Sequence, residues 1–466
     1  MEKKRMTLTL LLAFVQLAVM AQFTTTGNGT TYSISQLANT EGTYIIVYEA
    51  EDTPDYMPTY VLTQDITIAD GDKFVMDDGI VVLFNKDVML TIEGEADFRL
   101  TKGSVFDSVF GGETVGSGIR IKSKTTTEFE NCTFCYVGLK VMAEGATNVR
   151  HCNFLSHDGS TAAAIYFITA GAESTIEHCH FDECQKAAIG SAANAPQPLV
   201  IRDCELVKNS RANGNVPQIN ITAAPHIEIT NCEVAGDAMD ADANNKVGGI
   251  GISNFMAYPN TQVHISGCNI AWNRYGIGTV GPVADLRIEN CTLTDNNHEN
   301  NAMNGGSGIS LYDPYQQTQA VIAGNHIEGS LWGVTIIGCK DVNLGQPSNA
   351  DIQSPGGNVF KNNGFDGQLY DLYNNSTLTV YAQNNTWNVS EQTQEEIEKV
   401  IFHKADDSKL GEVIYWPAAE DTGIKEKKQL ADMPLTIYDL SGRKAGNDTS
   451  SHRKSIKIVN GKKVVY

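Results

Sequence analysis

The chain has 466 residues, 42 of them glycine, and a formal net charge of −21. Residues 1–21 carry +2 and residues 424–466 carry +6, so the segment between them carries −29. A segment this acidic argues against nucleic-acid binding. It also argues against the binding of acidic glycans, unless a cation or a local basic cleft intervenes, and it is compatible with neutral glycans or calcium as ligands.

Residues 1–21 have the pattern of a signal peptide. Three basic residues at positions 3–5 precede an apolar run from Leu8 to Met20, and the small residues Val19 and Ala21 provide a cleavage signal. The chain is therefore expected to be exported. No later apolar stretch is long enough to span a membrane. Residues 22–60 are expected to cap the edge of the domain that follows.

A cysteine repeat occupies the middle of the chain. A cysteine followed two residues later by an apolar residue recurs at intervals of 20 to 36 residues, a repeat period with loops of variable length. The members of this predicted structural column are Cys132, Cys152, Cys179, Cys204, Cys232, Cys268 and Cys291. Weaker copies downstream have asparagine in the cysteine position, at Asn325, Asn358 and Asn385.

Each repeat predicts a strand, a bend and another strand. Apolar residues alternate before the cysteine, as at Ile227 and Ile229, which indicates a short half-buried strand. The cysteine lies three residues after the last of these apolar residues, and in a regular strand an odd step would place it on the opposite face. A bend must therefore take up one residue, so that the cysteine and the apolar residue that follows it can both face inward. The residue just before the cysteine is always Asn, His, Asp or Gly, the types that accept a positive φ most readily.

The stretch EHCHFDEC, Glu177–Cys184, raises the alternative of a metal site, because histidine and cysteine are the residues that hold zinc. In the aligned repeats, however, His178 occupies the same position as Asn131 and Gly267, so it is interpreted as a turn residue. His180 is expected to face outward, and a surface metal site there stays open as an alternative.

Short strands that recur without helices between them predict an all-β solenoid in which each rung buries its apolar face on the next. Over residues 61–390 the pattern resembles the right-handed parallel β-helix of the pectate-lyase-like superfamily, followed by a small C-terminal β domain. The resemblance implies an architecture and leaves the chemistry open, because the fold hosts lyases, hydrolases, adhesins and inert modules.

The ten cysteines lie in a chain that is expected to be exported, which suggests disulfides. In-register side chains on parallel rungs point the same way, however, so the torsion of a bridge would be poor. We therefore expect the column to consist of buried thiols that act as small apolar side chains. Cys135 and Cys184 fall outside the column and are expected to be exposed or bridged.

Two long loops, residues 236–248 and 294–307, flank the short coil of Cys268 and are predicted to face each other across one rung. Their acidic residues and the groups near them are candidate catalytic residues, because glycoside hydrolysis uses two carboxylates and a lyase needs a base. These candidates are Asp237, Asp240, Asp242, Arg274, His298 and Glu299. Asp240, Asp242 and Asn244 also have the alternate-residue spacing of a calcium loop, without its glycine and distal glutamate.

Exposed aromatic residues are the candidate binding residues, because an aromatic ring can stack on a sugar ring. They are Trp272, Tyr275, Tyr312 and Tyr315, with Phe255, Tyr258 and Trp332 as further aromatics near bends.

The paired-aspartate, Gly-His-Gly and Arg-Ile-Lys signatures of polygalacturonases do not occur, nor do the motifs of pectate lyases. The favoured hypothesis is a noncatalytic module that binds a polysaccharide or a host or cell-surface ligand. The alternative is a polysaccharide lyase or glycoside hydrolase that acts between the two loops. The sequence assigns no cofactor, and calcium stays open as one.

The C-terminal part is predicted to contain a cap for the solenoid, a linker and a separate small domain. Residues 391–423 form the expected cap, with an amphipathic helix over Gln394–Lys404, and a lysine-rich linker spans residues 424–434. The stretches IYDLSGR at 437 and IVNGKKVV at 458 make residues 435–466 resemble the C-terminal sorting domain of the type IX secretion system of Bacteroidetes. The resemblance implies contact with that machinery and a location outside the cell or on the outer-membrane surface.

Overall fold

The computed structural model describes residues 22–48, 57–111, 117–159, 161–346 and 353–419, together with the backbone of four short strands between 437 and 465. The predicted signal peptide and the predicted linker lie outside the described residues. The chain divides into two compact units, Met1–Ala419 and Glu420–Tyr466. Among the described residues no helix is long and apolar enough to span a membrane.

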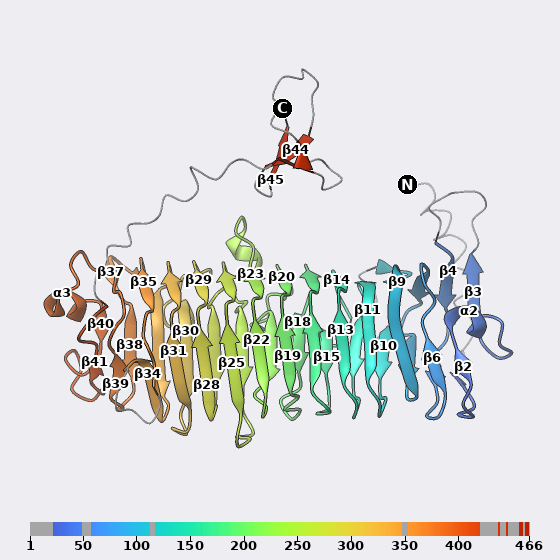
Figure 1. Cartoon of the computed structure of the whole chain (residues 1–466), viewed down its shortest axis with the longest axis horizontal. Helices are drawn as coiled ribbons and strands as arrows, with labels where there is room; N and C mark the ends of the chain where they lie inside the picture. The colour runs from blue at the N-terminus through green and yellow to red at the C-terminus, as the bar shows by residue number, and fades with distance from the viewer. Residues whose placement is uncertain are drawn as a thin grey trace. The chain divides into compact units, whose positions relative to one another are not determined.

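The first unit is a parallel β-helix whose rungs stack side by side from β1 to β40 (Figure 1). Its first face is a sheet of 14 parallel strands, here called face 1. The strands of face 1 are β1 (Phe23–Thr24), β5 (Ile66–Ile68), β8 (Met89–Ile92), β10 (Gly118–Ile121), β12 (Gly138–Val141), β15 (Ala163–Phe167), β18 (Ala187–Ser191), β21 (Ile219–Thr222), β24 (Ile250–Ser253), β27 (Ile277–Val280), β30 (Ser307–Asp313), β33 (Trp332–Gly338), β38 (Leu372–Asn375) and β40 (Ile401–Phe402).

Face 2 contains the strands that precede the cysteine column. They are β2 (Thr31–Tyr32), β6 (Lys73–Val75), the first parts of β9 (Glu95–Ser108) and β11 (Thr127–Cys135), β13 (Thr147–Arg150), β16 (Ser174–Glu177), β19 (Leu199–Arg202), β22 (Ile227–Thr230), β25 (Gln262–Ser266), β28 (Asp285–Glu289), β31 (Gln319–Ala323), β34 (Asp341–Gly345), β39 (Val380–Ala382) and β41 (Val413–Ile414).

Face 3 contains the strands that follow the cysteine column. They are β4 (Thr59–Leu62), β7 (Val81–Phe84), the second parts of β9 and β11, β14 (Asn153–Leu155), β17 (His180–Asp182), β20 (Glu205–Val207), β23 (Glu233–Ala235), β26 (Asn269–Ala271), β29 (Thr292–Thr294), β32 (His326–Glu328) and β35 (Val359–Lys361). The remaining small strands of this unit are β3 (Ile45–Tyr48), β36 (Gly364–Phe365) and β37 (Gln368–Leu369).

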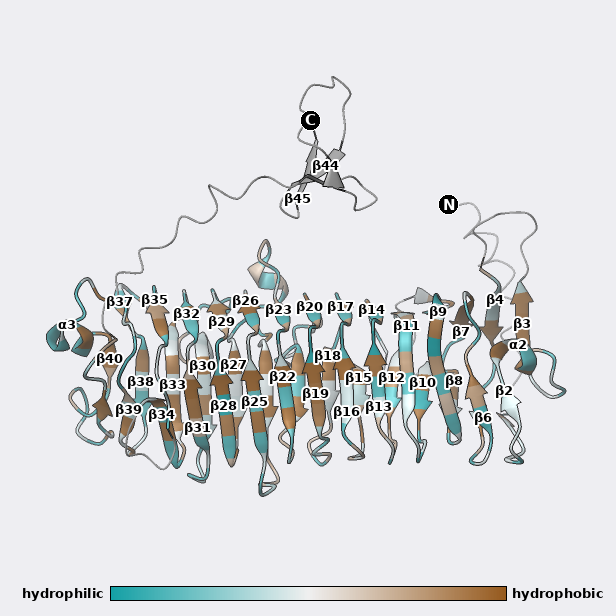
Figure 2. Ribbon diagram, viewed as in Figure 1, coloured by the Kyte–Doolittle hydropathy of each residue, from teal (hydrophilic) through white to brown (hydrophobic). Residues whose placement is uncertain are grey.

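The core consists of columns of side chains that lie in register on successive rungs, and the apolar bands repeat from strand to strand in Figure 2. On face 3, the rings of Phe134, Phe154 and Phe181 stack with centroid distances of 4.6 and 4.9 Å and interplanar angles below 10°. Each of the three is fully buried. Burying one such side chain contributes about 1.5–3 kcal/mol to the free energy of folding. The stacked columns therefore stabilise the solenoid without long helices.

The bend before each column cysteine is the predicted one. The preceding residue has a positive φ on every rung of the column, as at Asn131 (59°), His178 (51°) and Gly267 (63°). Every column thiol donates to the carbonyl oxygen two residues earlier, at 3.1–3.7 Å. The bend leaves that carbonyl pointing inward, so cysteine serves there both as a small apolar residue and as a weak donor.

All ten cysteines are free in the structure, and those of the column are at most 2 % exposed. The expectation for Cys184 was wrong, because this residue is fully buried in the core and is not bridged. It lies at the other end of face 3, where Asn209 occupies the next rung and accepts from the Cys184 amide at 3.2 Å. Burial raises the pKa of the Cys184 thiol to about 12, so it stays protonated. Cys135 is half-buried and also free.

An asparagine ladder continues the cysteine column. Asn325, Asn358 and Asn385 are buried. Asn325 Nδ2 donates to the side-chain Oδ1 of Asn358 on the next rung at 3.0 Å, and Asn358 Nδ2 donates to Asn385 Oδ1 at 2.9 Å. The residues before them also have positive φ values. The weak copies of the repeat are therefore true rungs with a stronger polar ladder in place of the thiols.

The histidines of EHCHFDEC have structural partners. The ring of His178 stacks on that of His151 at 4.9 Å, and His180 Nδ1 lies 3.0 Å from Glu205 Oε2 on the next rung. Among the residues that the structure describes, no group of three His, Cys, Asp or Glu side chains could hold a metal ion.

The two ends of the solenoid differ from the predicted boundaries. Strands β1 and β2 add rungs within the predicted N-terminal cap, and helix α2 (Ile34–Leu37) buries Ile34 and Leu37 over the core. At the other end helix α3 is only Gln394–Glu398, capped by Thr393, and the predicted continuation to Lys404 is wrong. Ile401 instead pairs with Leu372 in face 1, because strand pairing satisfies the backbone of this β-branched residue while its side chain stays buried.

In the second unit, the structure describes a four-stranded antiparallel sheet in the order β43-β42-β44-β45. Its strands are β42 (Ile437–Tyr438), β43 (Lys444–Ala445), β44 (Ile456–Val459) and β45 (Lys462–Val465). The small C-terminal β domain expected from the sequence is therefore present.

Candidate functional site

Long loops gather at one bend of the solenoid, between face 3 and face 1. Residues 208–218, 236–249 and 295–306 connect β20 to β21, β23 to β24 and β29 to β30, and the short coil of residues 272–276 lies among them. His298 Nδ1 lies 3.2 Å from Asn244 Oδ1, so the second and third loops meet across the short coil. The two predicted loops therefore face each other as expected, and a groove lies beside this contact on face 1.

The predicted acidic candidates do not converge. Asp237 is buried, accepts from the Met239 amide at 3.1 Å and lies 3.4 Å from Lys208 Nζ. Burial opposes ionisation of Asp237, but these two donors outweigh it and lower its pKa. Asp240 and Asp242 are exposed on the same loop, which contains the 3-10 turn Ala241–Ala243.

Asn244, the third residue of the suggested calcium loop, points inward. Its Oδ1 faces His298, and its Nδ2 donates to the Trp272 carbonyl at 3.4 Å. Burial lowers the pKa of His298, against the opposing effect of Asp237 and Asp295. The side-chain oxygen of Asn244 is therefore used inside the protein, while Asp240 and Asp242 face solvent.

Arg274 joins the walls of the groove. Its Nε lies 2.5 Å from Glu299 Oε2, and the two side chains are only 13 % and 20 % exposed. Its other nitrogens donate to Asn215 Oδ1 in one loop and to the Asn304 carbonyl in another. Arg274 thus spans the short coil and holds together two loops that are 89 residues apart at Asn215 and Asn304.

The groove on face 1 has a volume of about 380 Å³, and none of the described residues that line it is charged. It is lined by Asn215, Pro217, Asn220, Gly251, Ile252, Ser253, Phe255, Tyr275, Gly278, Thr279, Val280, Asn304, Gly305, Ser307, Ser310 and Tyr312. Amide and hydroxyl groups therefore accompany aromatic rings on a neutral surface, an arrangement that suits a neutral polar ligand with apolar faces.

Tyr275 lies in a trough that glycines leave open. A Cβ added to Gly248 would stand 2.1 Å from Tyr275 Cζ, and one added to Gly278 would stand 2.8 Å from Tyr275 Cε2. The absence of side chains at these positions is thus what lets the ring lie along the sheet. Burial raises the pKa of the Tyr275 hydroxyl to about 12, so the phenol stays neutral.

Two of the four predicted aromatic candidates line the groove, Tyr275 and Tyr312. Phe255, which the sequence had offered only as a further aromatic, also lines it and is 64 % exposed. Trp272 and Tyr315 are 37 % and 61 % exposed but lie outside the lining. Sequence reasoning missed Asn215, Asn220 and Ser310; aligning the strands of face 1 would have placed Asn220 and Ser310 in one outward column.

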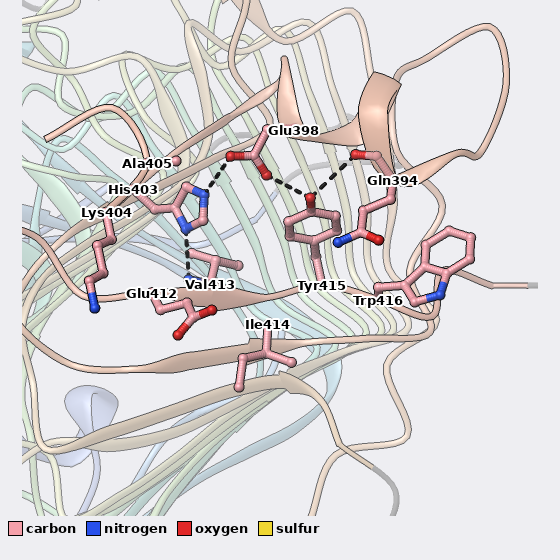
Figure 3. A pocket seen from close by; sticks show the side chains of 10 residues that line it. All are labelled: Gln394, Glu398, His403, Lys404, Ala405, Glu412, Val413, Ile414, Tyr415 and Trp416. Carbon is pink, nitrogen blue, oxygen red and sulfur yellow. Dashed lines mark hydrogen bonds and ion pairs between the residues drawn. The ribbon is translucent and has the colours of Figure 1, made fainter. Parts of the chain in front are cut away.

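A second pocket, of about 410 Å³, lies at the C-terminal rungs (Figure 3). In it Glu398 stands between two partners, 3.0 Å from His403 Nε2 and 2.6 Å from the hydroxyl of Tyr415. His403 Nδ1 accepts from the Val413 amide at 2.8 Å, so Nε2 carries the proton. These groups satisfy one another and tie α3 to β41, and we interpret the cluster as a clamp that closes the solenoid.

Comparison with known proteins supports the fold. A family model described as a right handed beta helix region matches residues 75–234. The crystal structure of the periplasmic alginate epimerase AlgG is similar with a TM-score of 0.51 at 9 % identity, covering 84 % of each chain. A double mutant of the same epimerase gives a TM-score of 0.49 at 10 % identity over 84 % of each chain. No curated protein matches. The first unit is a right-handed parallel β-helix.

Proposed function

We propose that this protein is an exported, noncatalytic β-helix protein that binds a neutral glycan in the groove on face 1. The observation that carries the proposal is the groove whose described lining is uncharged, in which exposed Phe255 and Tyr312 accompany the half-buried ring of Tyr275. Aromatic faces pack on the apolar faces of sugar rings, while the amides and hydroxyls of the lining can exchange hydrogen bonds with sugar hydroxyls. AlgG is similar in fold alone and supplies no substrate for this chain.

The lining favours binding over cleavage. Glycoside hydrolysis uses two carboxylates at a defined separation, and β-elimination needs a base. None of the described residues that line the groove is Asp, Glu, His, Lys or Arg. The candidate residues Asp237, Asp240, Asp242, His298 and Glu299 lie outside it.

Substitution of Phe255 or Tyr312 by alanine is expected to weaken the binding of a neutral polysaccharide by ~5–20-fold each, because each removes an aromatic surface worth about 1–2 kcal/mol. Affinity gel electrophoresis against xylan, glucomannan and mixed-linkage glucan would measure the effect. Tyr315→Ala and Tyr44→Ala remove equally exposed rings, 61 % and 58 %, outside the groove and should leave binding unchanged.

Equal retardation of the Phe255 and Tyr312 variants and the unmodified protein would refute the site. The same polysaccharides should be screened for released reducing ends and for the absorbance of unsaturated uronides. Either product would overturn the noncatalytic assignment and support the lyase or hydrolase alternative.

We also propose that residues 435–466 act as a type IX sorting domain and that the protein reaches the cell surface or the medium. The support is the resemblance of IYDLSGR and IVNGKKVV to that domain and the basic charge of this end of the chain. Truncation after Gly423 should leave the protein in the periplasm of a type IX-competent host, measured by cell fractionation. Equal amounts of truncated and full-length protein outside the cell would contradict the proposal.

A further inference from the structure

A single outward-facing column runs along face 1 beneath the proposed glycan groove. The register of neighbouring strands places its members directly beside one another from β10 to β30 (Figure 1). In order they are Arg120, Lys140, Tyr166, Gly190, Asn220, Gly251, Gly278 and Ser310. Seven steps of about 4.8 Å give the column a length of about 34 Å.

The first three members line a second groove, of about 650 Å³. Its lining residues are Arg120, Lys122, Lys140, Met142, Thr161, Ala162, Tyr166 and Ile168. It combines three cations with an aromatic ring and apolar side chains, and none of its described lining residues is acidic. In a chain whose net charge is −21, this groove is the local basic cleft that an acidic ligand would need.

Two of the cations lie close together. Arg120 and Lys140 are opposite one another on neighbouring strands, so their Cα atoms are about 4.8 Å apart. Burial, and next the charge of Arg120, lower the pKa of Lys140, while Asp65 and Asp87 oppose the shift. Lys122 is paired with Glu93 at 3.0 Å, whereas Arg120 Nη1 contacts the neutral Thr91 hydroxyl at 3.5 Å. An anion placed between Arg120 and Lys140 would relieve their repulsion.

The two grooves are separated along the column by one residue, Gly190. A Cβ added there would lie 3.0 Å from Ala163 Cβ and 3.4 Å from Tyr166 Cδ2. A side chain at this position would therefore crowd Ala163, contact the Tyr166 ring and lie between the two grooves. Glycine leaves the path between Tyr166 and Asn220 open.

We propose that the two grooves are subsites of one track, and that the ligand is a linear glycan with anionic substituents that lie over Arg120 and Lys140. The inference rests on the proposed function, which concerns the neutral subsite, and adds the charge pattern of the polymer. Carboxylate and sulfate groups share the required chemistry, because each accepts charge-assisted hydrogen bonds from Arg and Lys.

The test compares neutral, carboxymethylated and sulfated forms of two backbones, dextran and hydroxyethyl cellulose, by biolayer interferometry. The unmodified protein is expected to bind at least one anionic form ~10-fold more tightly than its neutral form at low salt, with the advantage shrinking as NaCl is added. Arg120→Gln with Lys140→Gln should remove that advantage while leaving the affinity for the neutral form within about twofold.

Two controls keep the result interpretable. Lys102→Gln with Lys409→Gln removes the same charge from exposed positions outside both grooves and should keep the advantage. Arg120→Lys with Lys140→Arg keeps both charges and should keep most of it. The inference would be overturned if the glutamine variant still bound the anionic form more tightly than the neutral form, or if the unmodified protein bound no anionic form more tightly. Failure of the proposed neutral subsite would show separately, as unchanged binding of neutral polysaccharide by the Phe255→Ala variant.

Discussion

Arg274→Ala is expected to loosen both walls of the neutral groove and to lower glycan affinity by ~10-fold or more. The substitution leaves Glu299 without its cation at a site that is 20 % exposed, and it removes the donors to Asn215 and Asn304. Loss of one partner from a buried ion pair costs about 3–5 kcal/mol, and the residual exposure of Glu299 reduces this to about 2–4 kcal/mol. Hydrogen exchange of the amides in residues 213–216 and 299–305 should report the loss as faster exchange.

The controls separate charge from bridging. Arg287→Ala breaks the exposed pair between Arg287 and Asp285, 3.3 Å apart, and should cost less than about 1 kcal/mol. Arg274→Ala combined with Glu299→Gln removes the unpaired charge and should recover much of the stability, but not the affinity, because Asn215 and Asn304 stay untethered. Full recovery of affinity in that double variant would show that Arg274 does not position the groove.

Asp371 is expected to make the protein less stable as pH rises from about 4 to about 7. The carboxyl is fully buried, with Oδ2 accepting from the Asn388 amide at 2.8 Å and Oδ1 from Asn363 Nδ2 at 3.2 Å. Burial raises its pKa to about 7, against the opposing effect of these two neutral donors. The folded state then holds a proton that the unfolded state releases near pH 4, so the free energy of unfolding should fall by roughly 3–5 kcal/mol across this window.

Urea unfolding of the unmodified protein and of Asp371→Asn, compared at pH 4, 5, 6, 7 and 8, measures this contribution. The asparagine carries a fixed cost, since its NH₂ replaces an acceptor, but that cost does not change with pH. The stability difference between the two proteins should therefore move in favour of the variant as pH rises and level off above pH 7. A pH-independent difference, like that expected for the exposed Asp366→Asn, would show that the carboxyl is ionised at low pH or open to water.

The architecture was predictable because it depends on local patterns that repeat. The strand before each cysteine, the positive-φ residue and the inward cysteine all lie within six residues of one another, so their alignment survives loops of different length. The end of the solenoid was harder, because the residues around Ile401 have a pattern that suits either a helix or a strand. Pairing with Leu372, 29 residues earlier, decided between them.

The candidate site was predicted only in part. The sequence located the bend where the long loops meet and two of the aromatic residues, Tyr275 and Tyr312. It gave too much weight to the acidic residues Asp240 and Asp242. Acidic residues in a loop indicate a catalytic site only if their side chains converge, and the side chains of these two residues face solvent. The basic cleft could not be found in the sequence, because Lys140 and Arg120 are 20 residues apart and net charge hides their proximity.

The sequence by itself determined that this protein stacks short strands into a solenoid with a thiol column at one bend, because strand alternation and backbone conformation are local properties. Only the tertiary structure decided which side chains share a surface. Register brings Arg120 and Ser310 onto one column of face 1, and Arg274 brings two distant loops together, because contacts between rungs depend on the length of every intervening loop.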